Sequence, residues 1–147
     1  HANVWYMQAF VLGRYAQRIS IVKALAEGIG GKVRKALDRA LELEPGHADA
    51  YIALGLYHAE IINKIGAMIG GLTYGAKASE AEKHIKEALK LTPTSPIAHI
   101  EHGNLLMLLH GDKKEDAAAA AYEKAAGCKP QDAMEALDAA YAKSELE

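Results

Sequence analysis

We predict an all-α fold for this chain, and three features of the sequence support the prediction. Alanine is abundant and proline occurs only four times in 147 residues, which favours helix over strand. Half of the residues are apolar and 24% are charged, and the length suits one domain over residues 1–147. Three stretches share one pattern of helix, proline, two spacer residues and helix: ALDRALELEPGHADAYIALG (36–55), HIKEALKLTPTSPIAHIEHG (84–103) and AYEKAAGCKPQDAMEALDAA (121–140).

Prolines and glycines define the predicted helix limits. The first helix, about 3–27, runs through VWYMQAFVLGRYAQRISIVKAL and ends at the AEGIGG segment. A second helix, about 31–43, ends before Pro45, because proline cannot continue a helix, and a third follows at about 48–66. The fourth, about 77–91, has Ser79 as its expected N-cap and Glu82 as the capping-box partner, and it ends before Pro93. Further helices are expected at about 96–110, 114–127 and 131–145.

The three proline junctions agree in detail. When they are aligned on their prolines, an alanine falls five residues before each one: Ala40 before Pro45, Ala88 before Pro93 and Ala125 before Pro130. This pattern resembles the tetratricopeptide repeat, in which small residues occupy the positions where two helices cross closely. The resemblance implies a right-handed superhelix of antiparallel helix pairs, with about three atypical repeats (4–45, 48–93 and 96–130) and a capping helix at 131–147.

These repeats are longer than the family period of about 34 residues. In the central repeat about 14 extra residues follow the helix at 48–66 and form an apolar, glycine-rich insertion at 61–75, and in the first repeat the segment AEGIGG adds about eight residues. A long helix followed by such a segment gives a weaker resemblance to regulators of microtubule dynamics, to related bacterial repeat proteins and to the T-components of TRAP transporters. These weaker resemblances include no motif specific enough to transfer an activity.

The tetratricopeptide resemblance implies a concave groove lined by the first helix of each repeat. Arg14 and Arg18 are four residues apart on one helical face, which suits a carboxylate on a peptide or a small acid. The alternative is that these arginines pair with Glu27, Glu60 or solvent. Carrying the family positions over predicts these groove residues: Phe10, Arg14, Gln17, Arg18, Ile52, Leu56, Glu60, Ile100, Asn104 and Met107.

The insertion is too apolar to remain in water without a partner. Its apolar residues recur at spacings of three and four, so it is expected to be helical at first and then broken by Gly70-Gly71 and Gly75, glycines that serve either turns or a close approach of the backbone. It either folds back into its own chain, covers a second subunit or meets a partner. The segment has no P-loop ending and lacks the net basic face of a membrane-surface helix. The candidate insertion or interface residues are Ile65, Met68, Ile69, Leu72 and Tyr74.

Metal binding and catalysis have little support in the sequence. His99 and His102 are three residues apart on one predicted helix, a spacing that suits two ligands of one metal ion. Hydrogen-bonded core histidines are the alternative, and neither an HExxH motif nor a cysteine pair is present. Because no Ser-His-Asp order or Gly-x-Ser-x-Gly elbow is visible either, we expect no enzyme, no catalytic residue and no cofactor.

Charge and hydropathy exclude two further classes. The formal net charge of -2 leaves no basic surplus for phosphates, so nucleic acid is not an expected partner. No run of 18 apolar residues occurs, so no membrane span is expected in this chain.

Because the chain begins with His1 and not with Met, we expect that the native N-terminus is missing. The prediction is a soluble domain, cytoplasmic or periplasmic, with the compartment left open.

The sequence therefore predicts a non-catalytic scaffold that binds a protein or peptide partner in a concave groove. One alternative is a periplasmic small-ligand-binding or transport accessory protein in which the insertion 61–75 lines a pocket or an oligomer interface. Another is a self-assembling structural protein, in which the insertion joins copies into a homo-oligomer.

Overall fold

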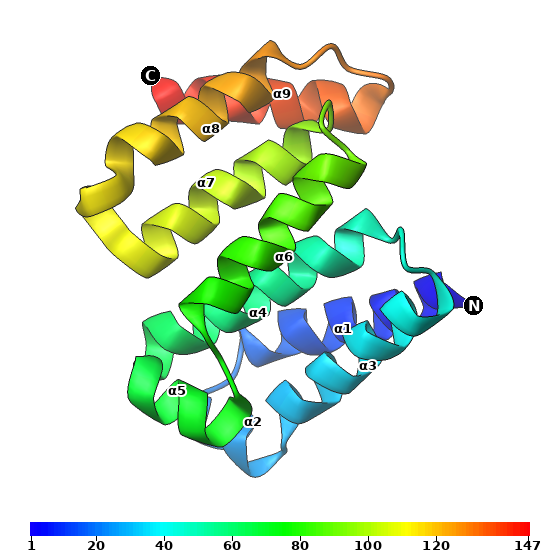
Figure 1. Ribbon diagram of the computed structural model, residues 1–147, viewed down its shortest axis with the longest axis vertical. Coiled ribbons are helices and arrows are strands. Elements are labelled where there is room, and N and C mark those ends of the chain that lie inside the picture. Colours follow the sequence, from blue (N-terminus) through cyan, green and yellow to red (C-terminus); the bar gives the residue numbers. More distant parts are fainter.

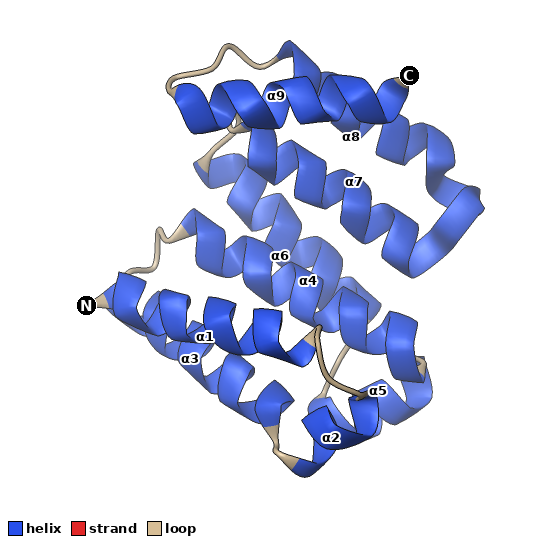
Figure 2. Cartoon of the chain, turned by 180° about the vertical axis from the view of Figure 1, so that it is seen from behind, coloured by secondary structure: helices blue, strands red, loops and turns tan.

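The computed structural model describes residues 1–147 and contains helices, turns and loops but no strand, which confirms the all-α prediction (Figure 1). Short loops join the helices, and the chain passes back and forth across the molecule from α1 at one end to α9 at the other (Figures 1 and 2). The elements are α1 (Ala2–Ala16), α2 (Ile21–Ala26), α3 (Ile29–Leu43), α4 (Ala48–Ile65), α5 (Ala67–Tyr74), α6 (Ala78–Leu91), α7 (Pro96–His110), the 3-10 turn η1 (Gly111–Lys114), α8 (Glu115–Gly127) and α9 (Ala133–Leu146).

The longer helices pack as consecutive pairs. Helix α1 lies against α3, α4 against α6, and α7 against α8, while α9 covers both α7 and α8 (Figure 1). Small residues allow these close approaches: the alanines at 40, 88 and 125 are fully buried. Gly55 and Gly103 lie at equivalent close contacts between helices. A Cβ on Gly55 would lie 3.1 Å from the backbone carbonyl oxygen of Ala81, and a Cβ on Gly103 would lie 3.2 Å from that of Ala118.

The hydrophobic core is divided among these pairs. One cluster joins α1, α3 and α4 around Leu37 and Leu54, and a second joins α4, α6 and α7 around Ile85 and Leu105. A third, smaller cluster around Ile100 holds α7, α8 and α9 together. None of the helices is both long enough and apolar enough to cross a membrane.

The structure corrects the prediction of one long helix over 3–27. Helix α1 ends at Ala16, and α2 begins after Ser20, whose extended backbone and side-chain oxygen cap the new helix by accepting from the Lys23 backbone N–H at 3.2 Å. A serine inside an apolar stretch thus begins a second helix there. The break lets α2 turn towards the start of α3.

The glycines of the insertion also act differently from the prediction. The turn falls at Gly66, with φ of 85°, and α5 ends at Gly75, with φ of 66°. Gly70 and Gly71 lie inside α5, so the predicted break there was wrong, whereas the break predicted at Gly75 is confirmed. A Cβ on Gly70 would lie 3.0 Å from the Cγ2 atom of Ile61, and glycine therefore serves close packing of α5 on the end of α4.

The predicted capping box at Ser79 is wrong as well. Lys77 is the N-cap residue of α6, and no side chain from the helix itself satisfies the cap. The Lys77 backbone N–H donates instead to Nδ1 of His58 on α4, at 3.2 Å. A long-range contact therefore replaces the local motif that the sequence suggested.

Candidate binding pocket

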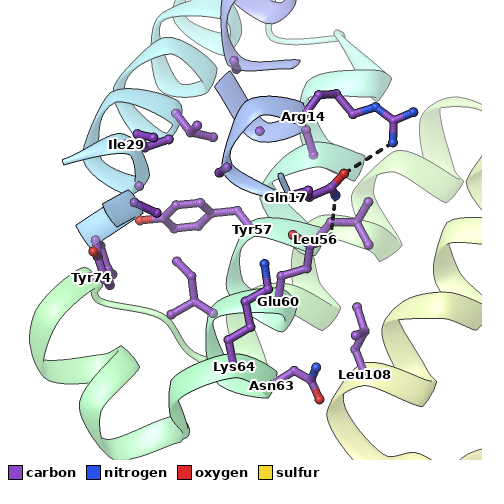
Figure 3. A pocket seen from close by; sticks show the side chains of 18 of the residues that line it. Arg14, Gln17, Ile29, Leu56, Tyr57, Glu60, Asn63, Lys64, Tyr74 and Leu108 are labelled. Atoms are coloured by element: carbon purple, nitrogen blue, oxygen red, sulfur yellow. Dashed lines mark hydrogen bonds between the residues drawn. The ribbon is translucent and has the colours of Figure 1, made fainter. Parts of the chain in front are cut away.

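A cavity of about 1090 Å³ opens between α1, α3, α4 and α7 (Figure 3). Nineteen of its 28 lining residues are hydrophobic, so its chemistry is that of an apolar site with a few polar groups. One wall comes from the face of α1 that carries Phe10 and Arg14. The opposite walls come from α4, at Leu56 and Glu60, and from α7, at Asn104.

Most of the predicted groove residues meet in this cavity. Three of them do not: Arg18 lies beyond the last turn of α1, and Ile52 and Ile100 are buried in the core clusters. The neighbouring helix covers these two isoleucines, so they support the packing of the walls and do not face the cavity. The residues that do line it are Phe10, Arg14, Gln17, Leu56, Glu60, Asn104 and Met107.

The cavity continues into an apolar chamber beneath α2, which the sequence analysis missed. Ile21 and Leu25 of α2 line this chamber. Ile29 of α3 and the ring of Tyr57 from α4 also line it (Figure 3). The signal for it was the Ser20 N-cap, because only a break at that point turns α2 back over the cavity.

The insertion contributes one side of the same chamber. Ile65 and Tyr74 line it, and the Tyr74 ring lies against Gly30 so closely that a Cβ on Gly30 would lie 2.7 Å from the ring. Met68, Ile69 and Leu72 do not line the cavity and are exposed. The insertion thus docks on its own chain through one side and presents the other side to solvent.

A chain of polar contacts crosses the opening of the cavity. The Arg14 guanidinium donates to the Gln17 side-chain oxygen at 3.4 Å, and the Gln17 amide donates to a Glu60 carboxylate oxygen at 3.5 Å (Figure 3). Arg14 also lies 5.8 Å from the centre of the Phe10 ring, a cation–π distance. These bonds are long and exposed, so a bound ligand can exchange them for its own at small cost.

A second polar group lies on the α7 side. The Asn104 amide donates to a Glu101 carboxylate oxygen at 3.2 Å, and the Tyr122 hydroxyl donates to the Asn104 carbonyl oxygen. Burial raises the pKa of Glu101, and the nearby charge of Glu60 raises it further, while the Asn104 hydrogen bond opposes both. Glu101 was not predicted, although it is three residues before Asn104 and therefore on the same helical face.

The two candidate metal ligands have other surroundings. His99 makes a 2.7 Å hydrogen bond through Nε2 to the Pro93 carbonyl oxygen, which fixes the turn between α6 and α7. Burial lowers the pKa of His102, and the neighbouring His99 lowers it further. No three His, Cys, Asp or Glu side chains are grouped closely enough to hold a metal ion.

Comparisons with protein-family models, with curated proteins and with solved structures found no match to this chain.

Proposed function

We propose that the protein is a non-catalytic scaffold that binds a segment of another protein, and that its helix pairs form a tetratricopeptide-like, right-handed superhelix. The main support is that one face of each of α1, α4 and α7 lines a single cavity, as the inner helices of such stacks do. The in-phase prolines and the buried alanines at the helix contacts support the same proposed arrangement of helix pairs.

The lining indicates what kind of segment would fit. Phe10, Leu56 and Met107 offer an apolar surface to one or two anchoring side chains, and methionine adapts to different shapes. Glu60 and Glu101 would favour a basic group on one side of the cavity, and Arg14 a carboxylate on the other. A short peptide with an apolar anchor between charges of both signs is therefore the expected ligand.

A peptide library displayed on phage tests this proposal. Peptides selected by the purified protein would be titrated against the wild type and two variants, Met107→Glu in the cavity and Leu43→Glu outside it. Both residues are partly exposed, so neither variant should unfold the protein. Met107→Glu should weaken binding by about tenfold or more, and Leu43→Glu should not. Equal effects, or no selected peptide, would contradict the proposal.

The two arginines offer a second matched pair. Arg14 lines the cavity and Arg18 does not, although both are exposed on the same part of the chain. Arg14→Glu should therefore reduce peptide binding more than Arg18→Glu does. Equal reductions would mean that only the overall charge matters.

A small apolar ligand is the second candidate, and the chamber beneath α2 favours it. Its walls, from Leu25 and Ile29 to Tyr57 and Tyr74, are almost entirely apolar and come from four separate helices. Native mass spectrometry of freshly purified protein tests this alternative. Extra mass that is lost on denaturation would support it, and a bare monomer would count against it.

A further inference from the structure

One end of the molecule combines exposed apolar side chains with exposed lysines. We call it the basic apolar end and define it as residues 18–35 and 61–79, which include α2, the start of α3 and α5. It lies opposite α9 (Figures 1 and 2). Its two segments are neighbours in space, because Leu25 of α2 and Tyr74 of α5 line the same chamber.

The apolar side chains here are unusually exposed. Met68 is 78% exposed and Leu72 84%, and Val22 of α2 is 71% exposed. Helix α5 docks through Tyr74 and Gly70, so the side that carries Met68 and Leu72 is left without a partner in this chain. A group of large apolar side chains on one end of a protein marks an interaction surface.

The charge of this end differs in sign from that of the whole chain. Residues 61–79 contain two lysines and no acidic residue, and residues 18–35 contain five basic residues and one acidic residue, so the end has a net charge of +6. The whole chain has -2, and the remainder therefore has -8.

Few of these cations are neutralised. The ion pairs of this end are Lys23 with Glu27, at 3.9 Å, and Arg34 with Asp38, at 3.1 Å. The exposed basic residues that have no acidic partner within ion-pair distance are Arg18, Lys32, Lys35, Lys64 and Lys77.

We propose that the basic apolar end docks on an anionic lipid surface, with Met68 and Leu72 inserted among the acyl chains and the lysines against the headgroups. Apolar insertion and attraction to anionic lipid act together in interfacial binding. Lys64 and Lys77 flank α5 directly, and lysine stems are long enough to keep the charge at the headgroups while the helix sinks below them. The insertion sequence has no basic face by itself, and the fold supplies the charge from α2 and α3.

The charge also argues against self-association through this end. A symmetric dimer would bring two surfaces of +6 together, and like charges at close range oppose contact. A lipid surface offers an apolar interior and negative charge at once, which matches both properties of this end. The inference does not rest on the peptide-binding proposal, because Met68 and Leu72 lie outside the cavity.

Vesicle co-sedimentation of the full chain tests the inference. The vesicles would be phosphatidylcholine with about 30% phosphatidylglycerol, and phosphatidylcholine alone. Three variants would be compared with the wild type: Met68→Glu, Lys64→Glu with Lys77→Glu, and the control Met134→Glu. Met134 has the same side chain and is 66% exposed, but it lies on α9 at the other end. Circular dichroism would verify that each variant keeps its helix content.

The wild type should bind the anionic vesicles and not the neutral ones, and added salt should weaken binding. Met68→Glu and the double lysine variant should each reduce binding by about tenfold or more, and Met134→Glu should leave it unchanged. Leu72→Glu replaces Met68→Glu if that variant does not fold.

Five results would overturn the inference. The first three are an absence of binding to anionic vesicles, equal binding to neutral vesicles, and equal effects of Met68→Glu and Met134→Glu. The fourth is binding to poly-glutamate as strong as to vesicles, and the fifth is a lipid-free oligomer that Met68→Glu abolishes, since each of these two would assign this end to a protein partner.

Discussion

Acid should destabilise this protein through one buried histidine. His58 is 1% exposed, and its ring stacks on that of His84 with centroids 5.7 Å apart. The pKa of His58 is lowered from its usual 6.5 to about 4, mainly by burial and then by the positive charges of Arg34 and His84, against the smaller opposing effects of Glu80 and Asp38. The folded protein therefore holds His58 neutral at a pH where the unfolded chain binds a proton.

The sign and the size of the effect follow from this difference. Between pH 6.5 and about 4 the unfolded state binds more protons, so stability is full above 6.5 and falls as the pH falls towards 4. A difference of about 2.5 pKa units corresponds to about 3 kcal/mol, of which about 2 kcal/mol should be lost between about pH 7 and pH 5. Burial also lowers the pKa of His84, which adds a loss of the same sign.

To test this, the free energy of unfolding in urea would be measured for the wild type and for His58→Asn at about pH 7 and about pH 5. Asparagine places a non-titrating oxygen near the position of Nδ1, so the acceptor for the Lys77 backbone N–H is kept. We expect the wild type to lose about 2 kcal/mol more than the variant on acidification. Identical losses would refute the reasoning, and so would a proton NMR titration that gives His58 a pKa near 6.5.

Two further predictions concern packing and capping. Gly13→Ala should stabilise the protein by up to about 1 kcal/mol, because a Cβ there meets nothing within 4 Å and alanine favours helix. Gly103→Ala should destabilise it by about 1 kcal/mol or more, because its Cβ would lie 3.1 Å from the Tyr122 ring. Urea unfolding would measure the free energy of unfolding of both variants, and changes of the same sign would contradict these predictions. Asp132→Ala should cost about 1 kcal/mol and loosen α9, because the Asp132 carboxylate accepts from the Glu135 backbone N–H at 2.8 Å. Unchanged amide exchange in α9 would exclude that role.

The limits of the helices could be predicted from the sequence wherever local chemistry determines them. The helices before Pro45 and Pro93 end within two residues of the predicted limits, because a proline restricts the backbone of the residue before it. The groove residues came from the repeat positions that the tetratricopeptide resemblance implies on α1, α4 and α7. Ile52 and Ile100 were misplaced, because spacing identifies a helix face but does not reveal that the next helix covers it.

The remaining features depend on contacts that the local sequence does not record. Gly66 makes a turn at a φ of 85°, and Gly70 makes a close helix contact beside the Cγ2 atom of Ile61, and the local sequence alone does not tell these two roles apart. The α6 cap was missed for the same reason, because its acceptor is His58, 19 residues earlier. The basic apolar end belongs here too, since its charges come from two segments that are distant in the sequence.

The cavity exists because α1 and α3 do not pack against each other along their whole length. Near the N-terminus, Ala9 packs in the core with Ala36 and Ala40, so α1 and α3 approach closely. At Gly13 the approach has ended, since no atom of another element lies within 4 Å of a Cβ position there, and Gly13 lines the cavity. The segments after α1 and after α4 then form α2 and α5, which close the open end with apolar side chains. These two segments are therefore the cause of the chamber, and shortening either one should remove the site while leaving α7, α8 and α9 folded.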